Sequence, residues 1–235
     1  MAGAILTLLI QRGCAGTGVL LNQLLFPNAS MAIYLLAILL APVLWIAAEK
    51  AGHGEPNLLQ PLWVILIVGV KMLVRGGPLT EEIGWRGFLL PSLLSRMSLF
   101  WASLLILPIW ALWHLPLWFL PGLPHHAWSF FQFLLMLAPL TLMFSWLYVK
   151  GQCKVWLPIF FHASINFSLN FSSVVPSRTS LHSGFPILLA LIWAAAAVLL
   201  CIDRELWFSF SPAVGHAPAQ GCSRELLTAG REYVM

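Results

Sequence analysis

Long apolar runs separated by short polar stretches dominate the pattern along this chain. A bilayer core about 30 Å thick requires about 20 apolar residues per helix. We therefore expect membrane helices at residues 29–48, 58–74, 98–120, 129–149, 155–171 and 185–202. The run at residues 5–26 is weaker because Gln11, Arg12, Asn22 and Gln23 interrupt it. It predicts either a poor spanning helix or an interfacial one, retained rather than cleaved because no basic start precedes it.

A shorter helix is predicted between the second and third of these runs, in the stretch GGPLTEEIGWRGFLLP. Proline favours the first turn of a helix, so the helix begins at Pro78 or Thr80 and runs to about Ser95. That length is short for a full span and indicates a tilted or partly buried segment. Together the runs predict an all-α, polytopic transmembrane helical bundle of about seven or eight membrane helices, including this short one.

The polar residues outside the runs predict domain organisation and topology. We expect one transmembrane domain at residues 1–202, with its motif-bearing core at 78–171, and a flexible polar tail at 203–235. Sorting the loop cations by alternating sides places Arg75 and Arg178 opposite a larger group: Lys50, Arg96, Lys150, Lys154 and Arg204. The positive-inside rule makes the larger group cytoplasmic, and the tail with it.

Composition agrees with an integral, multi-pass membrane protein. Of the 235 residues 60% are hydrophobic and only 9% are charged, which excludes an ordinary soluble domain. The net charge of +4 is scattered over loops, so nucleic-acid binding has no support. The four cysteines are far apart and form no CxxC pair, so we expect packing residues rather than a disulfide framework or a thiolate zinc site.

A few polar residues inside the apolar runs require an explanation. An ionisable side chain in the hydrocarbon region costs about 2.5 to 3.5 kcal/mol, so such residues usually line a cavity, form pairs or carry function. The main candidates are Glu81, Glu82, Arg86, His114, His162 and Asn166, with Lys71 and Asn170 as weaker ones. Glu82 and Arg86 are four apart, so they share a helix face and can form an ion pair. Glu81 lies about 100° round the helix and has no partner at that spacing, which makes it the freer carboxylate.

Helix geometry allows these groups to meet in one cavity. At a rise of 1.5 Å per residue, His114 falls near the same end of the membrane as Glu81, and His162 falls nearer the middle. His162 and Asn166 are four apart and share a face, either to join helices by hydrogen bonds or to act on a substrate. A carboxylate can take a proton from water, and histidine and asparagine can donate to an oxyanion. No serine or cysteine is paired with a base, which disfavours a covalent mechanism.

Three ordered motifs give these residues a family resemblance. The motifs are EExxxR at Glu81, Glu82 and Arg86, an FxxxH-like motif from Trp110 to His114, and HxxxN from His162 to Asn166. This set, on successive membrane segments, resembles the CPBP family of intramembrane proteases. That family includes type II CAAX prenyl endopeptidases and bacteriocin-processing or immunity proteins of the ABI group. The chain departs from the pattern at Trp110, where the family has phenylalanine.

The resemblance implies an intramembrane endopeptidase and a role for each motif residue. It implies that Glu81 and His114 activate water and that His162 and Asn166 form the oxyanion site. It also implies that Glu82 completes the site with support from Arg86 and Trp110.

Metal dependence and partners follow from the same resemblance. The family was long described as metalloproteases, and Glu82, His114 and His162 could supply three zinc ligands. The chain has no HExxH motif, and asparagine suits an oxyanion donor better than a zinc ligand. We therefore expect no cofactor and keep zinc as the alternative. The expected partners are the lipid bilayer and a peptide or protein substrate at the membrane, with a prenylated substrate as one option.

Two other kinds of function remain open at this stage. A non-proteolytic binding, immunity or scaffold protein could use the same polar cavity. A small transporter could use Glu81 and His114 as a proton relay. Transporters of that kind often show an inverted repeat or a pair of broken helices, which this sequence lacks.

Overall fold

The structure is a computed structural model that describes residues 21–52, 61–75, 77–120, 129–171 and 184–209, and all regular elements in these ranges are helical. Within the described part of the chain, five runs are long and apolar enough to cross a membrane: Met31–Ala51, Leu62–Leu94, Leu99–Phe119, Phe130–Lys150 and Gly184–Ile202. The prediction of an all-α membrane bundle is therefore confirmed.

The helix boundaries follow the apolar runs closely. The longer helices are α2 (Met31–Ala51), α3 (Leu62–Arg75), α6 (Leu99–His114), α7 (Phe130–Lys150), α8 (Trp156–Phe171) and α9 (Gly184–Ile202). The shorter ones are α4 (Pro78–Gly84), the π-helical η1 (Trp85–Leu89), α5 (Leu90–Leu94), the 3₁₀ helix η2 (Leu115–Phe119) and α10 (Arg204–Phe208). α8 has 16 residues, so at 1.5 Å per residue it is about 24 Å long and shorter than the hydrocarbon core.

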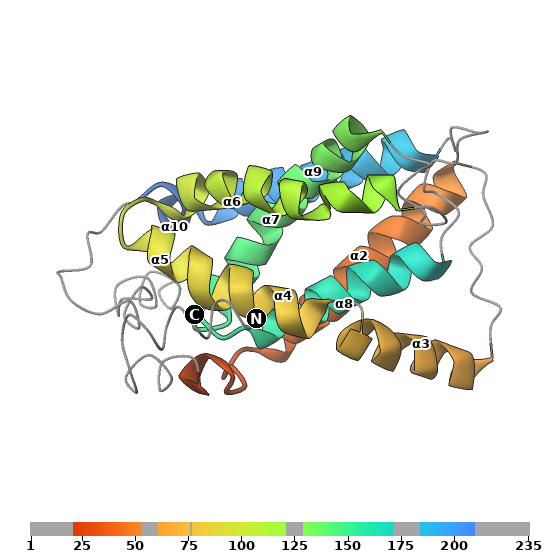
Figure 1. The fold of residues 1–235 in the computed structure, drawn as a ribbon, viewed down its shortest axis with the longest axis horizontal. Coiled ribbons are helices and arrows are strands. Elements are labelled where there is room, and N and C mark those ends of the chain that lie inside the picture. The colour runs from red at the N-terminus through yellow and green to blue at the C-terminus, as the bar shows by residue number, and fades with distance from the viewer. Residues whose placement is uncertain (1–20, 53–60, 76, 121–128, 172–183, 210–235) are drawn as a thin grey trace.

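Helix α7 forms the centre of the bundle. Nearly all of its side chains from Met136 to Val149 are buried, and it packs against α6, α8 and α9. A capping box starts it, because the Ser129 hydroxyl accepts from the Gln132 amide while the Gln132 side chain accepts from the Ser129 amide. Figure 1 shows α6 along one side of the bundle and α4 with α5 along the other, with α7 crossing between them.

The predicted motif helix is present and contains a local change of helical pitch. It begins at Pro78, after Gly77 in the left-handed conformation with φ of 99°, and it ends at Leu94. Between these points the Leu90 amide donates to the Trp85 carbonyl, which is a π-helical bond. Pro91 follows immediately, and proline has no amide hydrogen and clashes with the carbonyl four residues earlier. The wider π turn is a common way to accommodate such a residue, and it re-aims the side chains around it.

The N-terminal end of α8 is held by a segment that precedes α2. The Val155 amide donates to the Gln23 carbonyl at 3.1 Å, and the Trp156 indole donates to the Leu24 carbonyl at 2.7 Å. The rings of Phe26 and Trp156 stack with centroids 4.4 Å apart. These contacts fix where α8 starts. Most of the predicted weak run at residues 5–26 lies outside the described residues.

Two expectations from the sequence need correction. Residues 204–208 of the predicted tail form α10, whose Leu206 and Trp207 are buried, because apolar side chains in that stretch find a surface on α6 and α9. Residues 210–235 lie outside the described residues. Cys153 is buried in the hydrophobic core, as predicted for a packing residue, but the expectation of no disulfide is wrong for it, because it is disulfide-bonded. Pairing depends on the distance between cysteines in the fold, which sequence separation does not reveal.

Candidate active site

The start of the motif helix carries both glutamates. Gly77 precedes the helix, and its carbonyl accepts hydrogen bonds from the amides of Thr80 and Glu81 and from the Thr80 hydroxyl. Glu81 lies in the first turn, where the positive end of the helix dipole stabilises an anion. Glu82 follows and points the other way, into the bundle, where its side chain is fully buried.

The predicted ion pair between Glu82 and Arg86 is present, and a third residue joins it. Nη1 of Arg86 lies 3.1 Å from Oε1 and 3.0 Å from Oε2 of Glu82. Nδ1 of His162, on α8, lies 2.7 Å from Oε1 of the same carboxylate. Since a carboxylate only accepts, Nδ1 of His162 carries the hydrogen. Glu82, Arg86 and His162 therefore link the motif helix to α8 in the interior of the protein.

Aromatic rings enclose the guanidinium of Arg86. Its Cζ atom lies 4.5 Å from the centre of the Trp110 ring and 4.3 Å from the centre of the Phe144 ring. A cation between two ring faces gains electrostatic attraction from both. Its Nε and Nη2 atoms are buried without a hydrogen-bond partner among the described residues. The rings therefore take the place of some of the polar contacts that a buried guanidinium needs.

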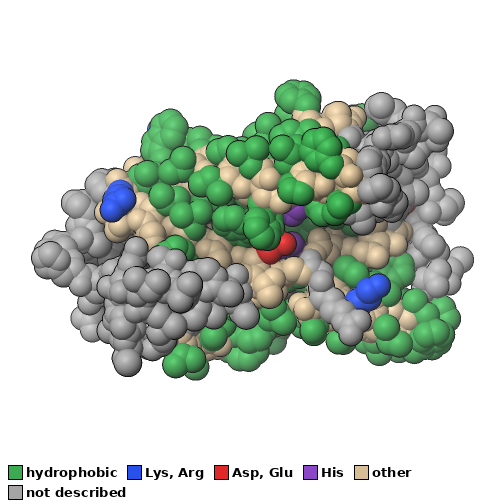
Figure 2. All heavy atoms as spheres, in the orientation of Figure 1, with side chains coloured by type: hydrophobic (Ala, Val, Ile, Leu, Met, Phe, Trp, Pro, Cys, Tyr) green, Lys and Arg blue, Asp and Glu red, His purple; other side chains and the backbone are tan. Residues whose placement is uncertain are grey.

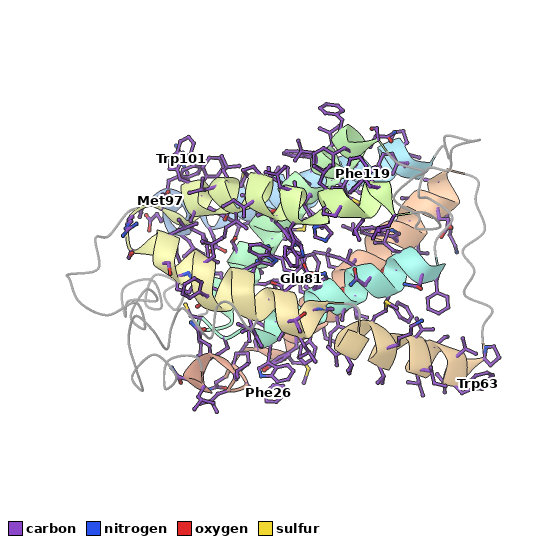
Figure 3. The ribbon with its side chains drawn as sticks, viewed as in Figure 1. Phe26, Trp63, Glu81, Met97, Trp101 and Phe119 are labelled. Carbon is purple, nitrogen blue, oxygen red and sulfur yellow. The ribbon has the colours of Figure 1, made fainter. Side chains whose placement is uncertain are left out.

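Glu81 has a partner that helix spacing did not predict. The indole nitrogen of Trp110, on α6, donates to Oε2 of Glu81 at 3.0 Å. The expectation that Glu81 is unpaired is therefore wrong, because its partner lies on another helix 29 positions along the chain. The carboxylate remains half-buried. Figure 3 shows Glu81 at the centre of the molecule, between its own helix and α6.

His114 lies at the last turn of α6, beside Trp110. Its Nδ1 atom lies 2.8 Å from the Trp110 carbonyl oxygen. A carbonyl oxygen only accepts, so Nδ1 carries the hydrogen, and in the neutral ring Nε2 has a free lone pair. The ring also contacts Phe133 of α7, with centroids 5.3 Å apart. His114 is therefore fixed in orientation and has Nε2 available to accept a proton or hold a water molecule.

His162 and Asn166 occupy successive turns of α8. His162 is buried, and its ring lies edge-on to Trp110 with centroids 5.8 Å apart. Asn166 is half-buried, and its backbone carbonyl accepts from the side chain of Asn170 at 2.8 Å. The structure thus brings α4, α6 and α8 together around Trp110, with Asn166 one turn beyond His162.

The site reaches the surface between hydrophobic side chains (Figure 2). Figure 2 shows a red acidic side chain and purple histidine atoms together near the middle of the face in view, between green hydrophobic side chains. Glu81 has the corresponding position in Figure 3, which is drawn in the same orientation. A half-buried acidic group among apolar side chains is costly in a membrane and therefore indicates function.

The alternative zinc ligands do not converge. Glu82 contacts Nδ1 of His162, the nitrogen that carries the hydrogen, and both of its oxygens also face Arg86. In the part of the chain that the structure describes, no three side chains among His, Cys, Asp and Glu are grouped to hold a metal ion. A cation beside the buried guanidinium of Arg86 would also be repelled. These residues do not fit a zinc centre, and we derive no step through one.

Sequence reasoning missed two residues that shape the site. Phe144 closes one face of the Arg86 guanidinium from the middle of α7, and a phenylalanine in an apolar run carries no signal of that role. Gly77 approaches Glu81 so closely that a Cβ atom at Gly77 would lie 2.6 Å from Oε1. The Gly-Pro pair was a usable signal for Gly77, because it marks a turn that needs glycine.

Comparison with known proteins agrees with the motifs. Residues 58–168 match the family model described as type II CAAX prenyl endopeptidase Rce1-like. The chain is 30% identical over 134 residues to CAAX prenyl protease 2 of Methanococcus maripaludis. The alignment covers 54% of this chain and 47% of the relative, so the chain spans about half the length of that curated protein. The resemblance to the CPBP proteases predicted from the motifs is confirmed.

Proposed function

We propose that this chain, an integral membrane protein whose residues 58–168 form an Rce1-like CAAX endopeptidase segment, hydrolyses a peptide bond of a membrane-associated substrate. The observation that carries the proposal is the arrangement of two adjacent carboxylates in different surroundings. Glu82 is buried against Arg86 and His162, and Glu81 is half-buried beside α6. One carboxylate holds the site together, and the other is accessible for chemistry.

In the proposed reaction Glu81 and His114 activate a water molecule. Water binds between the Glu81 carboxylate and Nε2 of His114, and Glu81 takes a proton as the water oxygen attacks the carbonyl carbon of the substrate. The tetrahedral intermediate then collapses with cleavage of the C–N bond, and Glu81 returns the proton to the leaving amine. The products are a carboxylic acid and an amine, and the acid proton then passes to the amine to give a carboxylate and an ammonium ion, so atoms and charges balance. A positioned acid-base group contributes on the order of 10² to 10⁴ in rate.

The oxyanion would form beside α8, where His162 and Asn166 are the proposed donors. Nδ1 of His162 donates to Glu82, so donation to the oxyanion from Nε2 requires a second proton on the ring. The Asn166 amide donates without that requirement. Donors fixed in place before the reaction stabilise developing charge most effectively in a site that excludes water.

Glu82 and Arg86 support the reaction by orientation. The carboxylate of Glu82 holds His162 by its Nδ1 hydrogen, and the guanidinium of Arg86 neutralises the carboxylate. This arrangement fixes the orientation of the His162 ring. In Ser-His-Asp triads an aspartate orients the catalytic histidine in the same way.

The relative's name and the family description favour a prenylated C-terminal peptide as the first substrate to test. A C-a-a-X sequence is the site of prenylation at its cysteine, so such a substrate would bring its own membrane anchor. The lipid bilayer is the second proposed partner. The cytoplasmic placement of the chain after residue 202 remains a prediction of the positive-inside rule.

The proposal is tested by purifying the protein in detergent and assaying a farnesylated C-a-a-X peptide beside its unprenylated counterpart. We expect Glu81→Gln and His114→Ala to lower cleavage by at least about 10²-fold while the helical content stays the same. Glu205→Gln, an exposed glutamate on α10, is the matched control and should cleave normally. Wild-type rates in Glu81→Gln would contradict the mechanism. Full biological activity in a Glu81→Gln/His114→Ala double variant would instead support the binding or immunity alternative.

A further inference from the structure

Trp110 contacts most of the polar residues of the site. It is 3% exposed, and its indole nitrogen donates to Glu81 at 3.0 Å. Its ring lies over the Arg86 guanidinium and edge-on to His162. Its backbone carbonyl accepts from Nδ1 of His114 at 2.8 Å. Two of these contacts, to Glu81 and His114, involve the two groups that the proposed function assigns to water activation.

The carboxylate of Glu81 is confined on both sides. Oε2 accepts the indole hydrogen of Trp110, and Oε1 lies against Gly77, where a Cβ atom would be only 2.6 Å away. A half-buried carboxylate on a flexible side chain otherwise samples several rotamers. The indole donor and the bare glycine backbone together leave it one narrow position, directed toward α6.

The indole N–H contributes separately from the ring that carries it. The family motif has phenylalanine at this place, and phenylalanine can fill the same space and lie over Arg86 but cannot donate to a carboxylate. If Trp110 only packed, its aromatic ring would account for its whole contribution. The indole N–H adds a hydrogen bond to Glu81, and a substitution can remove this bond while an aromatic ring remains.

We infer that Trp110 is a positioning residue: its indole N–H fixes the orientation of the Glu81 carboxylate, on which the proposed water activation depends. The inference rests on the proposed function and adds to it the residue that sets the geometry of the two groups. Trp110 orients both of them at once, Glu81 through its side chain and His114 through its backbone carbonyl. Only the side-chain contribution can be removed by substitution.

The test compares Trp110→Phe with Trp193→Phe in the detergent-purified full chain, using the farnesylated C-a-a-X peptide. Trp193 also donates an indole hydrogen bond, to the Leu135 carbonyl at 3.0 Å, but it lies outside the site. We expect Trp110→Phe to lower kcat by on the order of tenfold, since a hydrogen bond to a charged group is lost, with KM unchanged within about twofold. Trp193→Phe should leave both constants unchanged. An unchanged kcat in Trp110→Phe overturns the inference.

A second variant separates loss of the hydrogen bond from any folding defect that Trp110→Phe causes. Incorporation of 3-benzothienylalanine at position 110 keeps the size of the fused ring and replaces the N–H with sulfur. We expect the same loss of kcat with an unchanged thermal unfolding midpoint, and a wild-type kcat in this variant overturns the inference.

Glu81→Gln separates the two proposals. Active Glu81→Gln overturns the proposed function and the inference with it. Inactive Glu81→Gln together with fully active Trp110→Phe overturns the inference alone. Residual cleavage in Glu81→Gln should not fall further when Trp110→Phe is added, because the indole acts through the carboxylate. A further fall would assign Trp110 a role independent of Glu81 and contradict the inference.

Discussion

Nδ1 of His162 lies 2.7 Å from Oε1 of Glu82, across 80 positions of sequence and between two helices. The same carboxylate carries the ion pair with Arg86 four residues further on. All three side chains are buried, so the group has little access to solvent and its charges must compensate one another. The contact links the motif helix to α8, and these two helices also pack against each other elsewhere.

Substitution of Glu82 by glutamine should lower the free energy of unfolding of the protein. Glu82→Gln keeps the size of the side chain and removes its charge, which leaves the buried Arg86 without the carboxylate it is paired with. Breaking a buried pair in this way costs about 3 to 5 kcal/mol. We expect a clearly lower thermal unfolding midpoint in detergent, together with loss of cleavage.

Glu82→Gln/Arg86→Met is the control for that prediction. Replacing the second charge as well removes the uncompensated guanidinium, so stability should recover in part. Cleavage should not recover, because His162 has lost its carboxylate. A double variant less stable than Glu82→Gln would argue against an uncompensated charge as the cause.

Gly77→Ala should impair catalysis more than stability. Gly77 has φ of 99°, and its new Cβ would lie 2.6 Å from Oε1 of Glu81. The left-handed conformation costs a non-glycine residue about 1 to 2 kcal/mol, and the carboxylate can rotate away from the methyl group. The backbone strain is modest, but the displaced carboxylate loses the position in which it accepts from Trp110. We expect kcat to fall by on the order of tenfold or more in the peptide assay, because small misplacements are costly.

Gly69→Ala provides the matched comparison. Gly69 lies in α3 and has nothing within 4 Å of an added Cβ. Alanine is the better helix former by about 1 kcal/mol, so this variant should be as stable as the wild type or slightly more stable, with normal cleavage. Equal effects of the two substitutions on kcat would refute the specific role of Gly77.

Asn166→Ala should lower the turnover number without changing the fold. If the Asn166 amide donates to the oxyanion, its removal costs about 10² to 10³ in kcat. Asn170→Ala removes the same chemical group one turn further along α8, where the side chain is exposed and bonds to Met72 and to the Asn166 carbonyl. Steady-state kinetics of both variants should separate them. Equal losses would point to a helix-packing role for both asparagines.

Removal of metal ions should leave cleavage unchanged. The histidines and glutamates of the site are oriented toward one another, Arg86 and backbone groups rather than toward a common point. We expect rates within about twofold after dialysis against EDTA, and less than one zinc per ten protein molecules by metal analysis, since a catalytic zinc site needs three protein ligands. Loss of activity restored by added zinc would contradict this prediction.

Short-range features of the site could be predicted from the sequence because they depend on helix periodicity. The spacing of Glu82 and Arg86 predicted their ion pair, and Pro78 predicted the start of the motif helix. The partner of Glu81 could not be found in this way. Trp110 meets Glu81 only because the tertiary fold brings this residue of α6 to the start of the motif helix, and no spacing within one helix contains that information.

For this protein the sequence by itself determined the helices and the set of polar residues. Apolar runs of spanning length and the cost of burying charge are local properties, so their positions follow from residue order. Only the tertiary structure decided which polar groups touch. It pairs His162 with Glu82 and Trp110 with Glu81 and encloses Arg86 between Trp110 and Phe144. The physical reason is that hydrogen bonds act over about 3 Å, and helix packing alone sets such distances between residues far apart in the chain.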